Sequence, residues 1–162
     1  TQKQELNTTI MTKKILFICH GNICRSPMAE FIMKHLVETS DEIAQNSTFE
    51  IASAAVSTEE IGNDIYPPAK RTLAAHGIPF SRRGARQMTK ADYHYYDYIV
   101  CMDQSNLRLM RYIIGEDTQN KVSLLMQWAG KEASVADPWY TGEFETTYTD
   151  ILEGCKAMLK QL

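Results

Sequence analysis

The sequence predicts an α/β domain built on a parallel sheet. Short apolar runs typical of buried strands alternate along the chain with segments in which apolar residues recur at helical spacing. This alternation is typical of strand–helix–strand units, whose strands run parallel. A chain of 162 residues has the length of one domain with an ordinary core. We therefore expect a single domain over residues 13–162, preceded by a flexible N-terminal extension over residues 1–12.

Four strands and four main helices follow from these patterns. Strands are expected at residues 13–18, 49–54, 98–102 and 122–125. Helices are expected at residues 27–37 and 67–75, in a segment that carries Leu107, Met110, Ile113 and Ile114, and at residues 148–162. A proline pair begins the second helix and Gly77 ends it, while Asp103 or Ser105 caps the third. Residues 89–92 match a capping box, which predicts a further short helical turn.

Composition and charge exclude several classes of protein. Hydrophobic residues make up 44% of the chain and charged residues 23%, as in soluble globular proteins. No apolar run approaches the roughly 20 residues of a membrane helix, and the first ten residues lack the apolar core of a signal peptide. A net charge of −3 argues against a generic nucleic-acid binder. Four scattered cysteines do not form a disulfide framework, so a cytoplasmic location is expected.

One stretch near the N-terminus combines a strand, a tight turn and a helix start. The apolar run Ile-Leu-Phe-Ile ends at Cys19, and Gly21 and Asn22 are the residue types that most readily adopt positive φ. Ser26 and Pro27 then have the residue types of a helix N-cap and a first helical position. Ligands of open parallel sheets bind at the carboxyl ends of the strands, where this pattern places Cys19.

This loop is suited to binding an oxyanion. Successive backbone N–H groups and the unpaired N–H groups of a helix start attract negative charge. Arg25 can donate two hydrogen bonds to one phosphate. The same positive field should lower the pKa of Cys19 below its usual value of about 8.5, which predicts a thiolate placed for in-line attack on phosphorus. The simpler alternative is a buried cysteine that ends a strand, with Arg25 solvated.

The residues from Cys19 to Pro27 resemble the phosphate-binding loop of the low-molecular-weight protein tyrosine phosphatases. The resemblance continues from Lys14 through nearly all of the remaining chain. It implies a three-layer, flavodoxin-like (phosphotyrosine phosphatase I-like) fold, with a four-stranded parallel sheet in the order 2-1-3-4 flanked by helices. It also implies that residues 13–162 form one phosphatase domain, with Cys19 as nucleophile and Arg25 as phosphate ligand.

A leaving phenolate requires a general acid, and Asp137 is the strongest candidate. It follows the fourth predicted strand, and Pro138 stiffens the loop that carries it. The residues Asp137-Pro138-Trp139-Tyr140 resemble the family's Asp-Pro-aromatic-Tyr motif, which implies the acid role. An ordinary turn aspartate is the alternative. Asp103 follows the third strand but is better explained as a helix cap.

A wider set of residues is predicted to bind substrate around these three. They are His20, Gly21, Asn22, Ile23, Cys24, Ser26, Trp139 and Tyr140. The Ser26 hydroxyl could donate to the Cys19 sulfur, besides acting as a cap. The resemblance implies that Asn22 stabilises the loop in a network with Ser53 and His76. Trp139 and Tyr140 could form the cleft wall and stack on a substrate ring, or simply cover the core.

The other cysteines have different expected roles. Cys24 could form a disulfide with Cys19 on oxidation and so protect the nucleophile, or it could be a small buried residue. Cys101 and Cys155 lie on apolar faces of a predicted strand and helix, which favours the core.

Three positions depart from the family pattern. His20 stands where an apolar residue is usual, Glu59 where many members carry an aromatic residue, and Trp139 where tyrosine is more common. These positions are expected at the mouth of the cleft, where they would affect substrate preference and leave the chemistry unchanged. Ile23 fits tyrosine phosphatases, whereas related arginine phosphatases tend to carry threonine there.

The sequence therefore predicts a protein tyrosine phosphatase that uses no metal and no cofactor. Its expected partners are phosphotyrosine-containing proteins, with phosphate or sulfate able to occupy the loop, and neither nucleic acid nor membrane. Two alternatives remain. One is a thiol-dependent arsenate reductase of the same fold, which needs further cysteines close together. The other is a non-catalytic oxyanion-binding module, which would be favoured if Cys19, Arg25 or Asp137 were missing.

Overall fold

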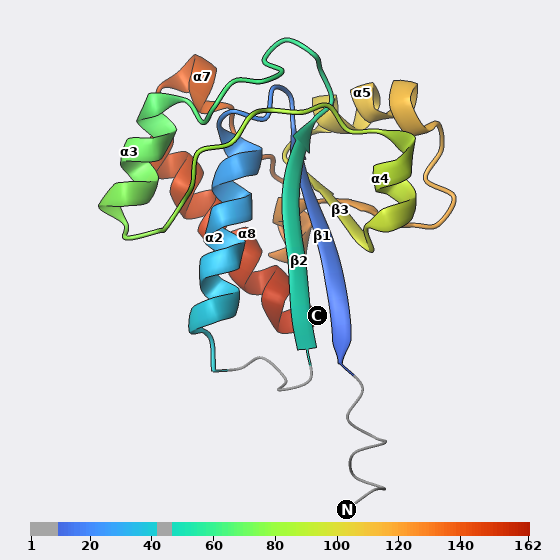
Figure 1. The fold of residues 1–162 in the computed structure, drawn as a ribbon, viewed down its shortest axis with the longest axis horizontal. Helices are drawn as coiled ribbons and strands as arrows, with labels where there is room; N and C mark the ends of the chain where they lie inside the picture. The colour runs from blue at the N-terminus through green and yellow to red at the C-terminus, as the bar shows by residue number, and fades with distance from the viewer. Residues whose placement is uncertain (1–9, 42–46) are drawn as a thin grey trace, which may run out of the picture.

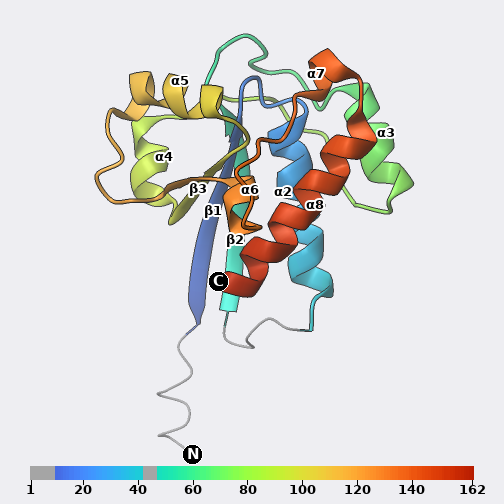
Figure 2. The same ribbon diagram turned by 180° about the vertical axis from the view of Figure 1, so that it is seen from behind.

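The computed structural model describes residues 10–41 and 47–162, which form three layers around one sheet (Figures 1 and 2). The four strands are β1 (Met11–Cys19), β2 (Ser47–Ala55), β3 (Tyr98–Cys101) and β4 (Val122–Leu124). They lie in the order β2-β1-β3-β4, and all neighbours pair in parallel. The predicted α/β class and the 2-1-3-4 order are both confirmed.

Helices cover both faces of the sheet. One face is covered by α2 (Arg25–Thr39), α6 (Leu125–Trp128) and α8 (Phe144–Gln161), and α3 (Pro67–Ala75) packs against α2 and α8. The other packs against α4 (Lys90–Tyr95) and α5 (Gln104–Ile114). The short helix α7 (Pro138–Thr141) lies near the carboxyl ends of the strands, at the top of Figure 1.

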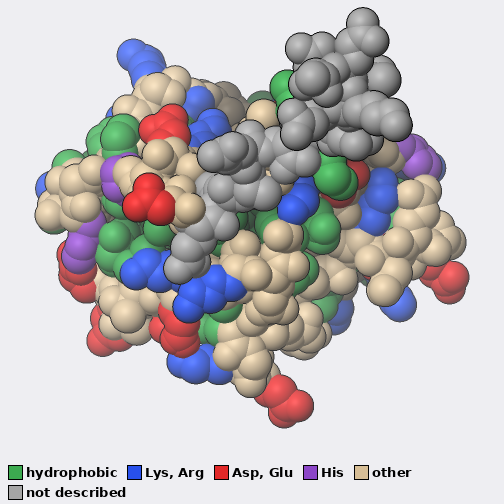
Figure 3. Space-filling model, turned by 90° about the horizontal axis from the view of Figure 1, so that it is seen from below, with side chains coloured by type: hydrophobic (Ala, Val, Ile, Leu, Met, Phe, Trp, Pro, Cys, Tyr) green, Lys and Arg blue, Asp and Glu red, His purple; other side chains and the backbone are tan. Residues whose placement is uncertain are grey.

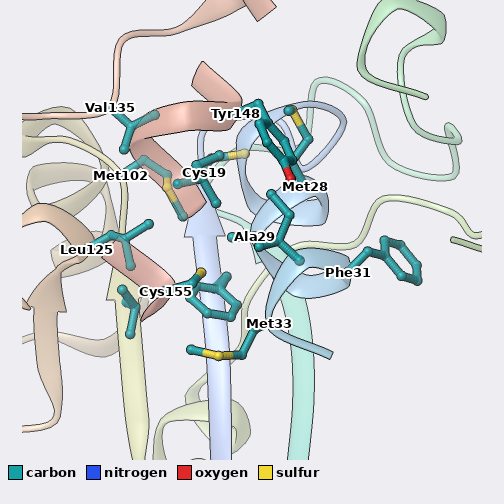
Figure 4. Close-up of a cluster of buried hydrophobic side chains, with 14 of the residues drawn as sticks. Cys19, Met28, Ala29, Phe31, Met33, Met102, Leu125, Val135, Tyr148 and Cys155 are labelled. Carbon is teal, nitrogen blue, oxygen red and sulfur yellow. The ribbon is translucent and has the colours of Figure 1, made fainter. Parts of the chain in front are cut away.

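The central strand β1 connects the two halves of the core. Ile15 and Phe17 belong to the cluster beneath α2 and α8, whereas Leu16 and Ile18 belong to the cluster beneath α4 and α5. Successive side chains of a strand point to opposite faces, so an unbroken apolar run fits a strand covered on both sides. Each such side chain contributes about 1.5–3 kcal/mol when fully buried. Figure 4 shows the first cluster, with Cys19 at the tip of β1.

The start of β1 differs from the sequence prediction. The strand begins at Met11, two residues earlier than expected, because Met11 and Thr12 pair with Ser47 and Thr48 of β2. The remainder of the expected extension falls largely on residues 1–9, which lie outside the described residues, as do residues 42–46 of the expected polar connection.

Several helix boundaries were predicted correctly. Helix α3 spans the expected residues, α4 begins with the expected capping box at Thr89 and Asp92, and Asp103 caps α5. The four-residue helices α6 and α7 were not predicted. Helix α8 begins four residues before the expected start, because the backbone N–H of Thr147 donates to the Glu143 carbonyl at 3.2 Å and closes a helical turn ahead of Tyr148.

The end of the molecule opposite the carboxyl ends of the strands has a mixed surface. Figure 3 shows acidic and basic side chains interspersed over that face. Within the part of the chain that the structure describes, no helix is long and apolar enough to cross a membrane.

Candidate active site

The loop between β1 and α2 is buried and tightly turned. Asn22 adopts a positive φ of 61°, a conformation that asparagine tolerates better than most residues. Helix α2 begins at Arg25, with Cys24 at the N-cap position. The prediction that Ser26 caps this helix is therefore wrong: Ser26 is its second residue, and its hydroxyl contacts the Cys19 sulfur and the Asn22 amide.

The Cys19 sulfur lies at the floor of the loop. It accepts the backbone N–H of Asn22 at 3.3 Å and lies 3.0 Å from the Ser26 hydroxyl oxygen. Hydrogen bonds donated to sulfur stabilise negative charge on it. The side chain is buried at the base of the pocket, so only a ligand that enters the loop can reach the sulfur.

Arg25 joins the loop to two other segments of the chain. Its Nη1 donates to an Asp103 carboxylate oxygen at 2.6 Å and to the Val135 carbonyl at 2.9 Å. Its Nη2 lies 3.4 Å from Asp137. Burial lowers the pKa of Arg25, but the charges of Cys19, Asp103 and Asp137 outweigh burial, so its pKa is raised. Arg25 is thus a permanent buried cation at 2% exposure.

Asp103 has two roles at this position. One carboxylate oxygen caps α5 by accepting the Asn106 N–H at 2.9 Å, as the sequence predicts. The other oxygen accepts the hydrogen bond from Arg25. The second contact was not predicted, because the cap alone accounts for an aspartate at the start of a helix.

Asp137 is the N-cap residue of α7 and faces the loop. One carboxylate oxygen accepts the Trp139 N–H at 3.0 Å, and the other faces Arg25. This N-cap hydrogen bond, together with the fixed φ of Pro138, orients the side chain. The predicted acid therefore lies beside the predicted phosphate ligand, although 112 positions separate them in sequence.

These groups surround one pocket of about 140 Å³. Its lining residues are Cys19, His20, Gly21, Ile23, Cys24, Arg25, Glu59, Glu60, Asp137, Trp139 and Tyr140. The structure thus brings nine of the predicted site residues to one cavity and adds Glu59 and Glu60. Asn22 and Ser26 are fully buried and are absent from this lining.

Comparison with known proteins identifies relatives over nearly the whole chain. A family model described as low molecular weight phosphotyrosine protein phosphatase matches residues 14–162. The Gallus gallus protein of that name is 42% identical over 154 residues, which cover 92% of this chain and 95% of that protein. Such a match is far above the level needed to establish common descent. The chain belongs to the low molecular weight phosphotyrosine protein phosphatase family.

Solved structures agree with this assignment. The low molecular weight protein tyrosine phosphatase SP-PTP from Streptococcus pyogenes superposes with a TM-score of 0.80 at 37% identity, covering 93% of each chain. Wzb from Vibrio vulnificus, solved in complex with benzylphosphonate, gives a TM-score of 0.79 at 28% identity, covering 93% of this chain and 99% of that one. The resemblance inferred from the sequence is thus confirmed, and the chain is a member of a family of enzymes.

In this phosphatase, Asn22 is the centre of a hydrogen-bond network beneath the loop. Its side-chain NH₂ donates to Ser26 at 2.8 Å and to Ser53 at 2.9 Å, and Ser53 in turn donates to Glu30 at 2.6 Å. The predicted partnership of Asn22 with Ser53 is confirmed. The sequence interpretation did not identify Glu30, which has the pattern of an ordinary surface helix residue.

The predicted place of His76 in this network is wrong. Its ring contacts Glu145 at 2.7 Å and stacks on Tyr148 at 3.8 Å between centroids, both in α8. Arg83 and the backbone of Arg86 approach Asn22 instead. Arg83 was missed, because a basic loop gives no sequence signal that tells a solvated arginine from one folded against a neighbouring loop.

The remaining cysteines are all free thiols in the structure. Cys24 lines the phosphatase pocket, and its pKa is raised, chiefly by burial and then by the negative charges of Cys19 and Asp137. Cys101 and Cys155 are fully buried, which confirms their predicted place in the core.

The mouth of the phosphatase pocket is more exposed than its floor. His20 and Glu59 form a pair at 3.0 Å. Trp139 packs against Tyr66 with ring centroids 4.8 Å apart, while Tyr140 is 83% exposed. The positions that depart from the family pattern lie here, as predicted.

Proposed function

We propose that this phosphatase hydrolyses phosphotyrosine in proteins, and small aryl phosphates, through a cysteinyl-phosphate intermediate. The observation that carries the proposal is the meeting of Cys19, Arg25 and Asp137 around one pocket. These groups are a nucleophile, a phosphate-binding cation and a proton donor, the three parts that the reaction requires.

The first step transfers the phosphoryl group to sulfur. The dianion occupies the loop, where the backbone N–H groups at the start of α2 and the Arg25 guanidinium bind its oxygens. A sulfur–phosphorus bond forms as the Cys19 thiolate attacks, and the bond from phosphorus to the phenolic oxygen breaks. Asp137 gives its proton to the leaving oxygen, so tyrosine departs as a neutral phenol.

The second step releases phosphate. Asp137, now ionised, takes a proton from a water molecule whose oxygen attacks phosphorus. The sulfur–phosphorus bond breaks and Cys19 leaves as a thiolate. The Ser26 hydroxyl and the Asn22 N–H stabilise that charge, which makes the sulfur a better leaving group.

The same groups support an anion site that works without a metal. Arg25 and the helix start supply the positive charge that a metal ion would otherwise provide. Binding of benzylphosphonate by the related Wzb supports the proposal that phosphate or sulfate occupies this loop. We further propose a cytoplasmic location, supported by the use of cysteine as an unpaired thiol at all four positions, since a nucleophilic thiol must stay reduced.

The test is p-nitrophenyl phosphate turnover with EDTA present. We expect turnover by the reduced wild type, loss of at least about 10⁴-fold in Cys19→Ser, and retention in Cys155→Ala, which changes a buried thiol that does not line the pocket. No turnover by the reduced wild type would contradict the proposal and favour an anion-binding module or an arsenate reductase. A phosphoarginine substrate, compared with a phosphotyrosine peptide, decides the substrate residue.

A further inference from the structure

Arg83 is the arginine that the proposed mechanism leaves without a role, although it reaches the catalytic loop. Its Nη2 donates to the Asn22 backbone carbonyl at 2.6 Å and to the Asn22 side-chain oxygen at 2.5 Å. Its Nη1 donates to the Asn63 carbonyl at 3.3 Å, and its backbone N–H donates to Asp64 at 3.2 Å. Arg83 therefore forms hydrogen bonds both with the loop that contains Asn63 and Asp64 and with the catalytic loop.

These contacts complete the hydrogen bonding of Asn22. Its side-chain NH₂ uses both N–H groups, on Ser26 and Ser53. Its side-chain oxygen accepts from Arg83 and from the backbone N–H of Arg86 at 3.3 Å. An amide has two donors and two lone pairs, so every position is filled in a residue with no exposed surface. Loss of Arg83 would leave a buried oxygen and a buried carbonyl short of a partner.

The conformation of Asn22 matters because its N–H points at the nucleophile. Asn22 has positive φ, and that backbone conformation directs its N–H to the Cys19 sulfur at 3.3 Å. A hydrogen bond that fixes the carbonyl and the side chain of the same residue also fixes the direction of its N–H. Arg83 holds both.

Arg83 also differs from Arg25 in its counter-charges. Arg25 is paired with Asp103 and Asp137. Within the described residues, the Arg83 guanidinium has no carboxylate at ion-pair distance and donates its hydrogen bonds to neutral oxygens of Asn22 and Asn63. Burial lowers the pKa of Arg83, against the attraction of Glu30, Cys19 and Asp64. An unpaired, half-buried cation beside the loop stabilises anionic sulfur and bound phosphate.

We infer that Arg83 is a positioning residue of the catalytic loop, which holds the Asn22 N–H on the Cys19 sulfur and adds a second positive charge beside it. This inference rests on the proposed phosphatase mechanism. Arg83 touches neither the sulfur nor the expected phosphate position, so it acts through Asn22 and through its charge.

The test compares Arg83→Gln and Arg83→Lys with the matched controls Arg82→Gln and Arg82→Lys. Arg82 is exposed and has no hydrogen bond in the described part of the chain. Two readouts are taken: kcat for p-nitrophenyl phosphate, and the rate at which iodoacetamide alkylates Cys19 at about pH 6, followed by mass spectrometry. A purely structural role would change thermal stability without changing sulfur reactivity in the folded protein.

We expect kcat to fall about 10- to 100-fold in Arg83→Gln and alkylation of Cys19 to slow roughly tenfold. Both the orientation of the Asn22 N–H and the positive charge of Arg83 are lost in this variant. Arg83→Lys keeps the charge, so alkylation stays within about threefold of wild type while kcat is intermediate. Equality of Arg83→Gln with Arg82→Gln in both readouts would overturn the inference.

Two further outcomes are decided by the same experiment. If Arg83→Gln does not fold, Arg83→Lys takes its place, and a kcat equal to that of Arg82→Lys overturns the inference. If the wild type alkylates at Cys19 but does not turn over substrate, the proposed function fails, and the alkylation rates still decide the role of Arg83.

Discussion

The floor and the mouth of the pocket differ in burial and in hydrogen bonding. At the floor, Cys19, Asn22 and Arg25 are at most 3% exposed. The Cys19 sulfur has hydrogen-bond partners within the loop, and the side chains of Asn22 and Arg25 have partners in other segments of the chain. At the mouth, Glu59 has a side chain that is 67% exposed, and Tyr140 is 83% exposed. The fold therefore fixes the positions of the side chains to which we assign catalytic roles. The side chains that would contact the part of a substrate beyond its phosphoryl group are exposed to solvent.

This difference has a physical reason. Buried polar groups are costly to leave unpaired, so each member of the floor network constrains the others. Exposed pairs such as His20 with Glu59 contribute little to folding and can change without structural cost. The comparison predicts that substitutions at the floor reduce the rate of phosphate transfer. Substitutions at the mouth should change substrate binding, or have little effect on activity and stability.

The largest effect beyond loss of the nucleophile is expected at Arg25. In Arg25→Lys the charge remains, but the planar fork that binds two phosphate oxygens is lost. We expect kcat/KM for p-nitrophenyl phosphate to fall about 10³-fold, the effect of losing a preorganised donor at the reacting group. The matched control is Arg111→Lys on the exposed face of α5. A loss below about threefold would show that Arg25 does not bind the phosphoryl group.

The next effect is expected at Asp137 and depends on the leaving group. Asparagine keeps an oxygen that can accept the Trp139 N–H, so Asp137→Asn preserves the start of α7 and removes only the proton donor. With phenyl phosphate, whose leaving group needs protonation, we expect kcat to fall about 10²-fold. With p-nitrophenyl phosphate the loss should be much smaller. Equal losses with both substrates would contradict the acid role.

A smaller and different effect is expected at Trp139. Its ring packs on Tyr66 at the mouth of the pocket, where it can contact a substrate ring. In Trp139→Ala we expect KM for a phosphotyrosine peptide to rise about 3- to 10-fold with little change in kcat. A fall in kcat comparable with that of Asp137→Asn would contradict the separation of mouth from floor.

Acid stability tests the segment that anchors Arg83. Asp64 is partly buried, but hydrogen bonds from Lys70 and from the N–H groups of Ile65 and Arg83 outweigh burial and lower its pKa to about 2 from 3.8. A lowered pKa means that ionised Asp64 stabilises the fold above about pH 4, and that this contribution is lost as pH falls towards 2. The melting-temperature difference between wild type and Asp64→Asn should therefore be largest near neutral pH and shrink below about pH 4. A difference independent of pH would contradict this account.

The smallest effect is expected at Glu59. Glu59→Gln removes the charge opposite His20 but keeps a hydrogen-bond acceptor, and both side chains are exposed. We expect the free energy of unfolding in urea to change by less than about 0.5 kcal/mol. A loss above about 1 kcal/mol would mean that the mouth is as structurally constrained as the floor.

The parts of the site that could be predicted are those encoded locally. Cys19, Arg25 and the strand, turn and helix around them lie within one short stretch, and Asp137 is followed by a recognisable motif. The alternation of strands and helices was likewise sufficient for the α/β class. The local pattern gave a wrong helix cap at Ser26. Serine is a common N-cap residue, but the Ser26 hydroxyl contacts the Cys19 sulfur and the Asn22 side-chain amide instead.

The contacts that could not be predicted are those between distant segments. Arg83 lies 61 positions from Asn22, and its contact depends on how the loop that carries it folds beside the catalytic loop. His76 was assigned to the network through the resemblance alone, yet α8 supplies closer partners in Glu145 and Tyr148. Such choices are made by tertiary packing, which a single sequence does not reveal.

The most direct test of the central claim is to trap the intermediate. The wild-type protein is mixed with excess p-nitrophenyl phosphate, quenched in acid during turnover, digested and analysed by mass spectrometry. The account predicts one added phosphoryl group on the peptide that contains Cys19, with the group assigned to that residue. Turnover without such an adduct, or with the phosphoryl group on Cys24 or another residue, would contradict it.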